Sequence, residues 1–498
     1  MLQKLSGMDS TFYYMESPET PMHVAGLIIL EKPEGMTGPF RETYIDAIRE
    51  RAELVPMFRW HPEPSPLDID YPVWVEESHI DWRHHVKTVE LPEPKDEQAL
   101  YDLCMELHIK PIDMTRPLWE TYVIEGLPGN RVALYQKLHH AAIDGQAGMI
   151  IQQIMFDQTP ESKPLPPKSL LAMLHFDRTT TRVSPSLGDT VVNMVQDRLS
   201  RPITKDIEQL AVAAQKGWGM MRKIQTEKIS MSAPRSRFNA PVIAKRVYGA
   251  GSIPFTEMKE AGKVFGATIN DVTISLCGGA IRRYLEEKND LPEESLIAGA
   301  PIAMKQKRHS LNNVSQMNIS FCTDIADPLE RLEAVKISAK QGKELAAQLI
   351  ETTDEMSKVG ALPNIITKAA LSLAKNPKIA SAITPPFNMV MSNVKGERNP
   401  LYIAGCKVVT NYPISALGHG QGVNITCVSY LDQLDFGILA SPNVVPDPDV
   451  LIDYILDEFK EFKALADAHK DGNAPAAKAS GTKKKTVKKV AKKKTAAA

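Results

Sequence analysis

The sequence LHHAAIDG at residues 138–145 sets two adjacent histidines, His139 and His140, ahead of an aspartate and a glycine. The preceding run VALYQKL, residues 132–138, has the composition of a β-strand. Because successive side chains of a strand point to opposite faces, His140 shares a face with Leu138, whereas His139 points to the other. We therefore expect the two imidazoles to act separately, with His140 aimed into apolar surroundings at the strand end.

A histidine directed inward at a strand end is suited to general-base catalysis. The neutral imidazole accepts a proton near pH 7, and burial of an imidazole lowers its pKa and keeps it neutral. Asp144 would either hold the tautomer of His140, as in a catalytic triad, or brace the turn. Gly145 permits a tight turn or close approach of a substrate to the backbone. The alternative for His140 is a histidine whose hydrogen bonds are satisfied in the core.

The sequence does not predict a metal site. His139 and His140 diverge, no HExxH motif occurs, and none of the five cysteines belongs to a CxxC pair. We interpret the cysteines as free thiols in a reducing compartment. A second histidine pair, His84 and His85, lacks an acid and a glycine at matching offsets, so we interpret it as structural.

Five stretches, in a fixed order along the chain, together resemble the bacterial wax ester synthase/acyl-CoA:diacylglycerol acyltransferase family. The resemblance covers about residues 5–465. HHxxxDG alone is shared with a superfamily that includes chloramphenicol acetyltransferase, carnitine acyltransferases and condensation domains of peptide synthetases. The stretches are LSGMD with PMHV (residues 5–9 and 21–24), Pro117-Leu118-Trp119, HHAAIDG (residues 139–145), Asn270-Asp271-Val272 with RRYL (residues 282–285), and Ser392-Asn393-Val394 with Gly396.

The resemblance implies an α/β fold of two chloramphenicol-acetyltransferase-like domains, joined by a long, partly helical crossover, with the active site between them. Alternating strand-like and helical stretches fit the same fold class. We predict a first acyltransferase domain at residues 1–159, a crossover at 160–241, a second domain at 242–472 and a disordered lysine-rich tail at 473–498. The clearest elements are strands at 24–30, 118–125, 132–140, 423–430 and 434–440, a helix at 40–53, and helix starts at Thr268, Asp327 and Asp447.

The resemblance also implies an O-acyltransferase. It would move a long-chain acyl group from acyl-CoA to a fatty alcohol, giving a wax ester, or to diacylglycerol, giving triacylglycerol. His140 would be the general base of a direct transfer through a tetrahedral intermediate. Asp144 would be mainly structural, and Asn270 would face His140 from the second half. Acyl-CoA is a co-substrate, so no bound cofactor is expected.

The other motif residues have local interpretations as well. Asp271 stands where a capping box places its acid, and we interpret it as a helix cap first. Asn270 lies in the first helical turn, where it would donate to an oxyanion or cap locally. Trp119 is interpreted as packing before substrate contact. Asn393 and Gly396 indicate a turn, which the resemblance alone places near the substrate.

Charge is distributed unevenly along the chain. The total is −1, yet residues 478–498 contain nine lysines and no acid, so the remaining chain is correspondingly more acidic. We expect this tail to bind an anionic membrane or lipid-inclusion surface. It lacks aromatic residues for base stacking, which disfavours nucleic acid as a partner. Without a long apolar run or a leader-like start, we expect a cytoplasmic protein, peripheral on the inner membrane or on lipid inclusions, with no obligate protein partner.

Two other classes of function stay open on the sequence. One is a condensation-type acyltransferase that uses carrier-protein thioesters instead of acyl-CoA. The other is a non-catalytic protein that binds lipid surfaces or nucleic acid through the tail. Turnover by a protein without the tail would exclude the second class.

Overall fold

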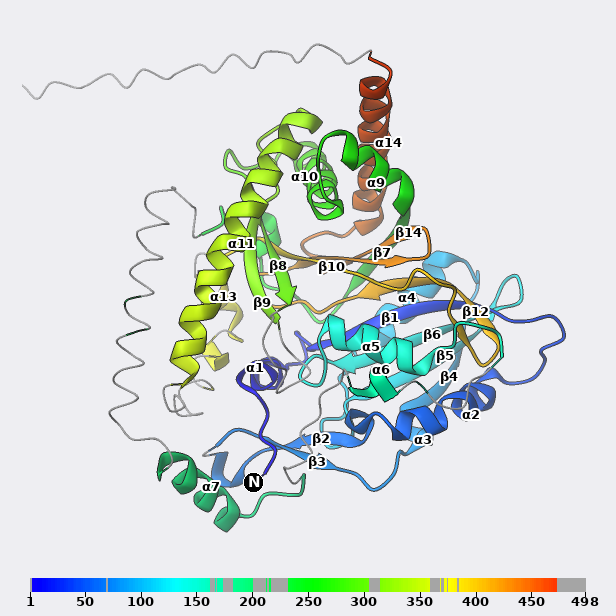
Figure 1. The fold of residues 1–498 in the computed structure, drawn as a ribbon, viewed down its shortest axis with the longest axis vertical. Helices are drawn as coiled ribbons and strands as arrows, with labels where there is room; N and C mark the ends of the chain where they lie inside the picture. The colour runs from blue at the N-terminus through cyan, green and yellow to red at the C-terminus, as the bar shows by residue number, and fades with distance from the viewer. Residues whose placement is uncertain are drawn as a thin grey trace, which may run out of the picture.

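The computed structural model consists of two six-stranded β-sheets that lie one above the other, with helices packed against them (Figure 1). It describes residues 2–68, 70–161, 166, 168–172, 182–199, 212, 215, 232–303, 314–358, 368, 371–373, 375–382 and 385–472. The predicted tail and much of the predicted crossover lie outside these residues. The predicted mixed α/β architecture with two sheet-containing halves is confirmed.

The first sheet positions the HHxxxDG turn. Its strands pair antiparallel, except for the two at one edge, which are parallel. The strand that precedes the motif ends at His139, one residue earlier than predicted. The strand order is β11 (Tyr402–Ile403), β12 (Cys406–Ile414), β1 (His23–Glu31), β6 (Arg131–His139), β5 (Trp119–Leu127) and β4 (Val86–Glu90).

Helices cover both faces of this sheet. Helices α2 (Phe40–Glu53) and α5 (Gly145–Met155) share one apolar core with it, and α4 (Glu97–His108) shares another on the opposite face. Helix α2 has the predicted bounds, because Phe40, Tyr44, Ile45 and Ile48 recur at helical spacing and are buried. The remaining elements are α1 (Gly7–Met15), α3 (Trp82–His85), α6 (Lys168–Ala172), α7 (Leu187–Leu199), β2 (Trp60–Glu63), β3 (Val73–Glu76) and the short turns Pro56–Arg59, Pro66–Asp68 and Arg237–Asn239.

The second sheet has its helices on the face away from the first sheet (Figure 1). They are α9 (Phe255–Val264), α10 (Ile269–Glu287), α11 (Pro328–Lys358) and α14 (Pro448–Lys470), and α13 (Pro377–Ala382) follows α11 in the chain. The three predicted helix starts are confirmed. The strand order is β7 (Val247–Pro254), β14 (Gln433–Ala440), β13 (Val423–Tyr430), β10 (Met389–Val394), β8 (Ile297–Ala303) and β9 (Val314–Ser320).

The second half of the chain also completes the first sheet. Strand β12 pairs antiparallel with β1, with Ala25 opposite Ile414. Residues 402–414 therefore lie in the first sheet, although the predicted second domain, 242–472, included them. A short sequence pattern can indicate a strand, but it does not indicate which sheet the strand joins. The pairing of residues 402–414 with the first sheet was therefore not predicted.

A buried carboxylate ties the two sheets where β12 crosses β14. Asp435 is 1% exposed, and its oxygens accept from Thr410 Oγ1 at 2.9 Å and from Ser252 Oγ at 2.6 Å. Burial raises the pKa of Asp435, and these hydrogen bonds oppose the increase. The contact links a strand of the first sheet to two strands of the second.

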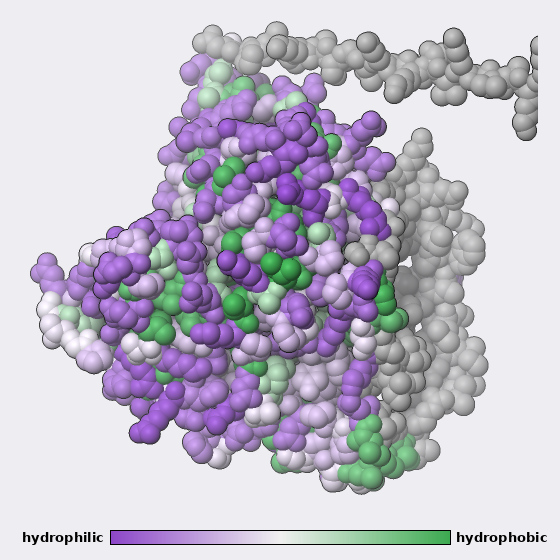
Figure 2. All heavy atoms as spheres, turned by 180° about the vertical axis from the view of Figure 1, so that it is seen from behind, coloured by the Kyte–Doolittle hydropathy of each residue, from purple (hydrophilic) through white to green (hydrophobic). Residues whose placement is uncertain are grey.

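Hydrophilic side chains dominate the face drawn in Figure 2, with apolar ones gathered near mid-height and again at the α7 end. In the described part of the chain, no single helix has both the length and the apolar composition to cross a membrane. Only α9 and α10 taken together meet that test, and they are bent by 95° relative to each other.

Candidate active site

A cavity of about 850 Å³ lies between the two sheets. This volume is in the usual range for a small-molecule site. Strands β1, β5 and β6 with helices α2 and α5 form one wall, and β8, β10 and β13 form the other. The lining is mainly apolar, with a few polar groups. Such a cavity can hold an alkyl chain and direct its polar end to specific side chains.

His140 lines this cavity from the turn after β6. Its backbone N–H donates to Met22 O at 2.8 Å, which fixes the turn against the start of β1. Its imidazole stacks on the ring of Phe12, with centroids 4.0 Å apart and planes 8° apart. One face of the imidazole is therefore held against α1, while His140 lines the cavity.

His139 is fully buried and lies outside the set of described residues that line the cavity. Its Nδ1 accepts from the backbone N–H of Ala141 at 3.0 Å, and its Nε2 lies 3.3 Å from Glu16 Oε2. The two imidazoles diverge, as the strand period predicts. His139 therefore stabilises the turn that carries His140, through its contacts with Ala141 and Glu16.

Asp144 and Gly145 form the start of α5 beside His140. Asp144 is 3% exposed, and its Oδ1 accepts from the N–H of Ala147 at 2.8 Å, so it caps the helix. A Cβ on Gly145 would lie 3.4 Å from Cγ2 of Val394 on β10. The HHxxxDG turn thus closes the gap between the two sheets.

Trp119 is both packed and part of the cavity wall. Its indole Nε1 donates to Phe58 O at 3.0 Å, and its ring stacks on His85 with centroids 4.4 Å apart. His85 Nδ1 pairs with Trp119 O at 2.8 Å, and burial lowers the pKa of His85 to about 4. These contacts agree with a structural role for the His84–His85 pair.

Comparison with known proteins identifies the chain. Residues 5–273 match the wax ester synthase/diacylglycerol acyltransferase (WS/DGAT) catalytic domain, and residues 311–463 match the WS/DGAT C-terminal domain. The chain belongs to the WS/DGAT family. It is accordingly an acyltransferase, and the predicted family and enzyme class are confirmed.

Relatives and solved structures cover nearly the whole chain. A putative diacylglycerol O-acyltransferase of Mycobacterium bovis is 32% identical over 464 residues, which are 91% of this chain and 97% of the relative. The WS/DGAT of Marinobacter aquaeolei VT8 is 26% identical, with a TM-score of 0.66 over 93% of this chain and 100% of that one. The first condensation domain of the calcium-dependent antibiotic synthetase shares the fold, at 12% identity and a TM-score of 0.55 over 93% and 97% of the two chains.

The WS/DGAT motif at Asn270 and Asp271 lies away from the cavity. Asp271 Oδ2 accepts from the N–H of Thr268 at 2.9 Å, and Thr268 Oγ1 accepts from the N–H of Asp271 at 3.2 Å, so the predicted capping box is confirmed. Helix α10 packs against α11 and α14 on the outer face of the second sheet. Neither Asn270 nor Asp271 is among the described residues that line the cavity. The expectation that Asn270 faces His140 is therefore corrected.

The motif on β10 contributes a different residue from those predicted. Ser392 and Val394 line the cavity, whereas Asn393 points to the other face and is exposed. Gly396 also lies outside the described lining. Its N–H donates to Ser429 Oγ at 3.1 Å, and a Cβ there would overlap the Ser429 carbonyl. Close backbone packing thus requires a glycine at position 396. The alternation of side chains along β10 would have indicated Ser392 as the residue that faces the cavity.

Two polar residues of β13 were missed by the sequence analysis. Asn424 and Thr426 line the cavity and are 3% and 8% exposed. Thr426 Oγ1 donates to Asn424 Oδ1 at 2.8 Å, and the strand register places Thr426 opposite Ser392 of β10. The available signal was the period-two placement of two polar residues in the otherwise apolar run VNITCV.

Among the residues that the structure describes, no three His, Cys, Asp or Glu side chains are placed to hold a metal ion together.

Proposed function

We propose that the protein transfers a long-chain acyl group from acyl-CoA to the hydroxyl of a fatty alcohol or of diacylglycerol. The observation that carries the proposal is the placement of His140 at an apolar cavity between the two sheets. The relatives support both acceptors, because those from Mycobacterium are named diacylglycerol O-acyltransferases and that from Marinobacter is named for both activities.

His140 would act as the general base. Its imidazole takes the proton from the acceptor hydroxyl, whose oxygen attacks the thioester carbonyl carbon of acyl-CoA. The tetrahedral intermediate collapses to the ester, and His140 returns the proton to the departing CoA sulfur. A positioned general base contributes about 10²–10⁴-fold to such a reaction.

The facing wall would hold the developing oxyanion. Ser392 and Thr426 line the cavity from neighbouring strands of the second sheet, and the Thr426 hydroxyl already donates to Asn424 Oδ1. Strand β10, which carries Ser392, reaches the HHxxxDG turn through the approach of Val394 to Gly145. A hydroxyl donor aimed at the carbonyl oxygen stabilises the charge that forms there. We assign this role to Ser392 in place of Asn270.

Asp144, which lines the cavity, and the buried His139, which does not, would both support the base. Asp144 caps α5 through Ala147, so its carboxylate is engaged with the helix start. His139 is directed away from the cavity. The cavity needs no bound cofactor in this mechanism, since acyl-CoA brings the activated acyl group.

The lysine-rich tail would keep the enzyme close to its lipid substrates. Each lysine near an anionic membrane contributes about 1 kcal/mol, so nine lysines suffice to hold a protein at the surface. Deleting residues 473–498 should abolish salt-sensitive binding to anionic liposomes. Unchanged binding by the shortened protein would refute a role for the tail.

The experiment that tests the catalytic proposal is CoA release from palmitoyl-CoA, with 1-hexadecanol or diacylglycerol as acceptor and the lipid products resolved. His140→Ala should lower acceptor-dependent release by about 10²–10⁴-fold. His84→Ala, the same substitution in the second histidine pair, should leave it unchanged. Full activity of His140→Ala would refute the base. Absence of release with either acceptor from folded protein would favour carrier-protein thioesters as donors.

A further inference from the structure

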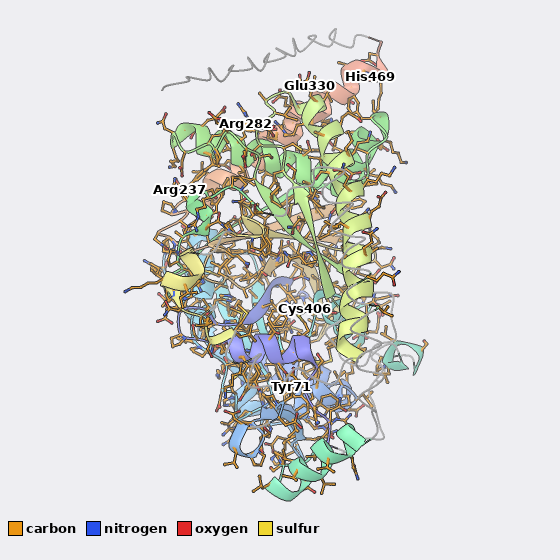
Figure 3. All side chains as sticks on the ribbon, turned by 90° about the vertical axis from the view of Figure 1, so that its left-hand side faces the viewer. Tyr71, Arg237, Arg282, Glu330, Cys406 and His469 are labelled. Atoms are coloured by element: carbon orange, nitrogen blue, oxygen red, sulfur yellow. The ribbon has the colours of Figure 1, made fainter. Side chains whose placement is uncertain are left out.

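The segment that joins α1 to β1 contacts the HHxxxDG turn through one carboxylate. Glu16 follows α1, and its Oε2 accepts from the N–H of Met22 and lies 3.3 Å from His139 Nε2. Glu16 is 15% exposed at its side chain, and His139 is fully buried. Figure 3 shows α1, in blue-violet, in the lower part of the molecule, below the strands of the second sheet.

The hydrogen bonds of His139 define its tautomer. The N–H of Ala141 donates to Nδ1 at 3.0 Å, so Nδ1 carries a lone pair and the ring proton is on Nε2. That proton is directed to the carboxylate of Glu16. Glu16 therefore accepts from two donors, one on the last residue of β6 and one on the residue just before β1.

The same contacts lead directly to the catalytic histidine. The peptide of Met22 donates to Glu16 through its N–H and accepts from the N–H of His140 at 2.8 Å through its carbonyl. Phe12, on the helix that Glu16 follows, stacks on the His140 ring. A shift of Glu16 would move both the backbone partner and the ring partner of His140.

We propose that Glu16 is a positioning residue for His140, acting through the tautomer of His139 and the peptide of Met22. The inference rests on the proposed function, in which His140 is the base. Glu16 does not line the cavity among the described residues, so it acts through its neighbours and not on the substrate. A displacement of about 1 Å at a catalytic group can cost about 10²-fold in rate.

Glu16→Gln separates positioning from simple packing. The amide has nearly the same shape, but only its oxygen accepts a hydrogen bond. If that oxygen keeps the Met22 N–H, the amide NH₂ faces His139 Nε2. The His139 ring must then release its Nε2 proton and carry it on Nδ1, where the donor N–H of Ala141 already points. The variant therefore fills the same space while disrupting the hydrogen-bond arrangement.

The test compares Glu16→Gln with Glu19→Gln in the full chain. Glu19 is three residues away in the same segment and is exposed, so it is a matched control. We expect kcat for acyl transfer to fall about 10- to 100-fold in Glu16→Gln, with KM for palmitoyl-CoA unchanged. Glu19→Gln should behave as the unsubstituted protein. A kcat within twofold of that protein for Glu16→Gln would overturn the proposal, and so would an equal loss in Glu19→Gln.

A second readout does not depend on activity. NMR of isotope-labelled histidine should show His139 in the Nε2–H tautomer, and Glu16→Gln should change that signal. His139 in the Nδ1–H form in the unsubstituted protein would overturn the inference. If Glu16→Gln does not fold, Glu16→Asp replaces it, because the shorter carboxylate keeps the charge but cannot reach both donors. If the NMR result holds while the protein transfers no acyl group, the proposed function fails and the contact at Glu16 stands.

Discussion

Arg51 and Asp157 form a buried ion pair that should control the stability of the first sheet. Arg51 Nη2 lies 2.6 Å from Asp157 Oδ1, with side chains 3% and 8% exposed, and Arg51 Nη1 donates to Met155 O at 3.0 Å. The backbone of Asp157 exchanges two hydrogen bonds of 2.7 Å with Tyr402 of β11. The pair thus joins α2, the end of α5 and a strand from the second half of the chain.

Removing one charge of this pair should lower the free energy of unfolding much more than removing both charges. Asp157→Ala takes the carboxylate from a buried guanidinium, and loss of one partner of a buried pair costs about 3–5 kcal/mol. The double variant with Arg51→Met removes the second charge as well and should recover part of that loss. Asp46→Ala breaks the exposed pair with Arg49, whose side chains are 77% and 51% exposed, and should cost less than about 1 kcal/mol.

Urea unfolding followed by tryptophan fluorescence measures these differences. Because two-domain chains can unfold in more than one step, the midpoint of the first transition is compared among the variants. Asp157→Ala should shift that midpoint far more than Asp46→Ala does. The reasoning is refuted if the two single variants shift it equally, or if the double variant is less stable than Asp157→Ala.

Three further predictions concern acid stability, the backbone packing at Gly396 and the wall of the cavity. Burial lowers the pKa of His108 to about 3 and that of His85 to about 4. The unfolded chain therefore binds more protons below pH 6.5, and each histidine should lower stability by about 2 kcal/mol on going from pH 6.5 to pH 5. A melting temperature that stays level over this range would contradict this. Gly396→Ala would place a Cβ on a main-chain carbonyl of β13 and should lower the melting temperature measured by calorimetry. An unchanged melting temperature would contradict this, because it would mean that β13 shifts to make room for the methyl group. Ser392→Ala should lower kcat for acyl transfer by about 10²-fold, whereas Asn393→Ala, on the other face of β10, should not. Equal values of kcat in the two variants would refute the proposal that Ser392 stabilises the oxyanion.

Much of the local structure could be predicted because its signals act over a few residues. The helix at Phe40–Glu53 and the strand at Val423–Tyr430 have the predicted bounds. The cap at Thr268 follows from one side-chain pair within a single turn. Strand period alone separated the two histidines of the HHxxxDG turn, and the structure places only His140 at the cavity.

Errors arose where a residue's role depends on a distant partner. Asn270 was assigned to the site by resemblance, but its helix packs on the outer face of the second sheet. Asn393 was selected in place of Ser392, although one residue of shift along a strand reverses the face. Gly396 is explained by its contact with Ser429, which no local pattern contains.

The sequence by itself determined several of the helices and strands, the base candidate and the family, because caps, periodicity and motif spacing are properties of neighbouring residues. The tertiary structure alone decided which distant segments meet. It brought β12 into the first sheet, placed Thr426 opposite Ser392 on the cavity wall, and set Glu16 against His139, 123 positions away. Each of these contacts depends on strand pairing and packing between residues far apart in the chain, and local sequence does not encode such pairings.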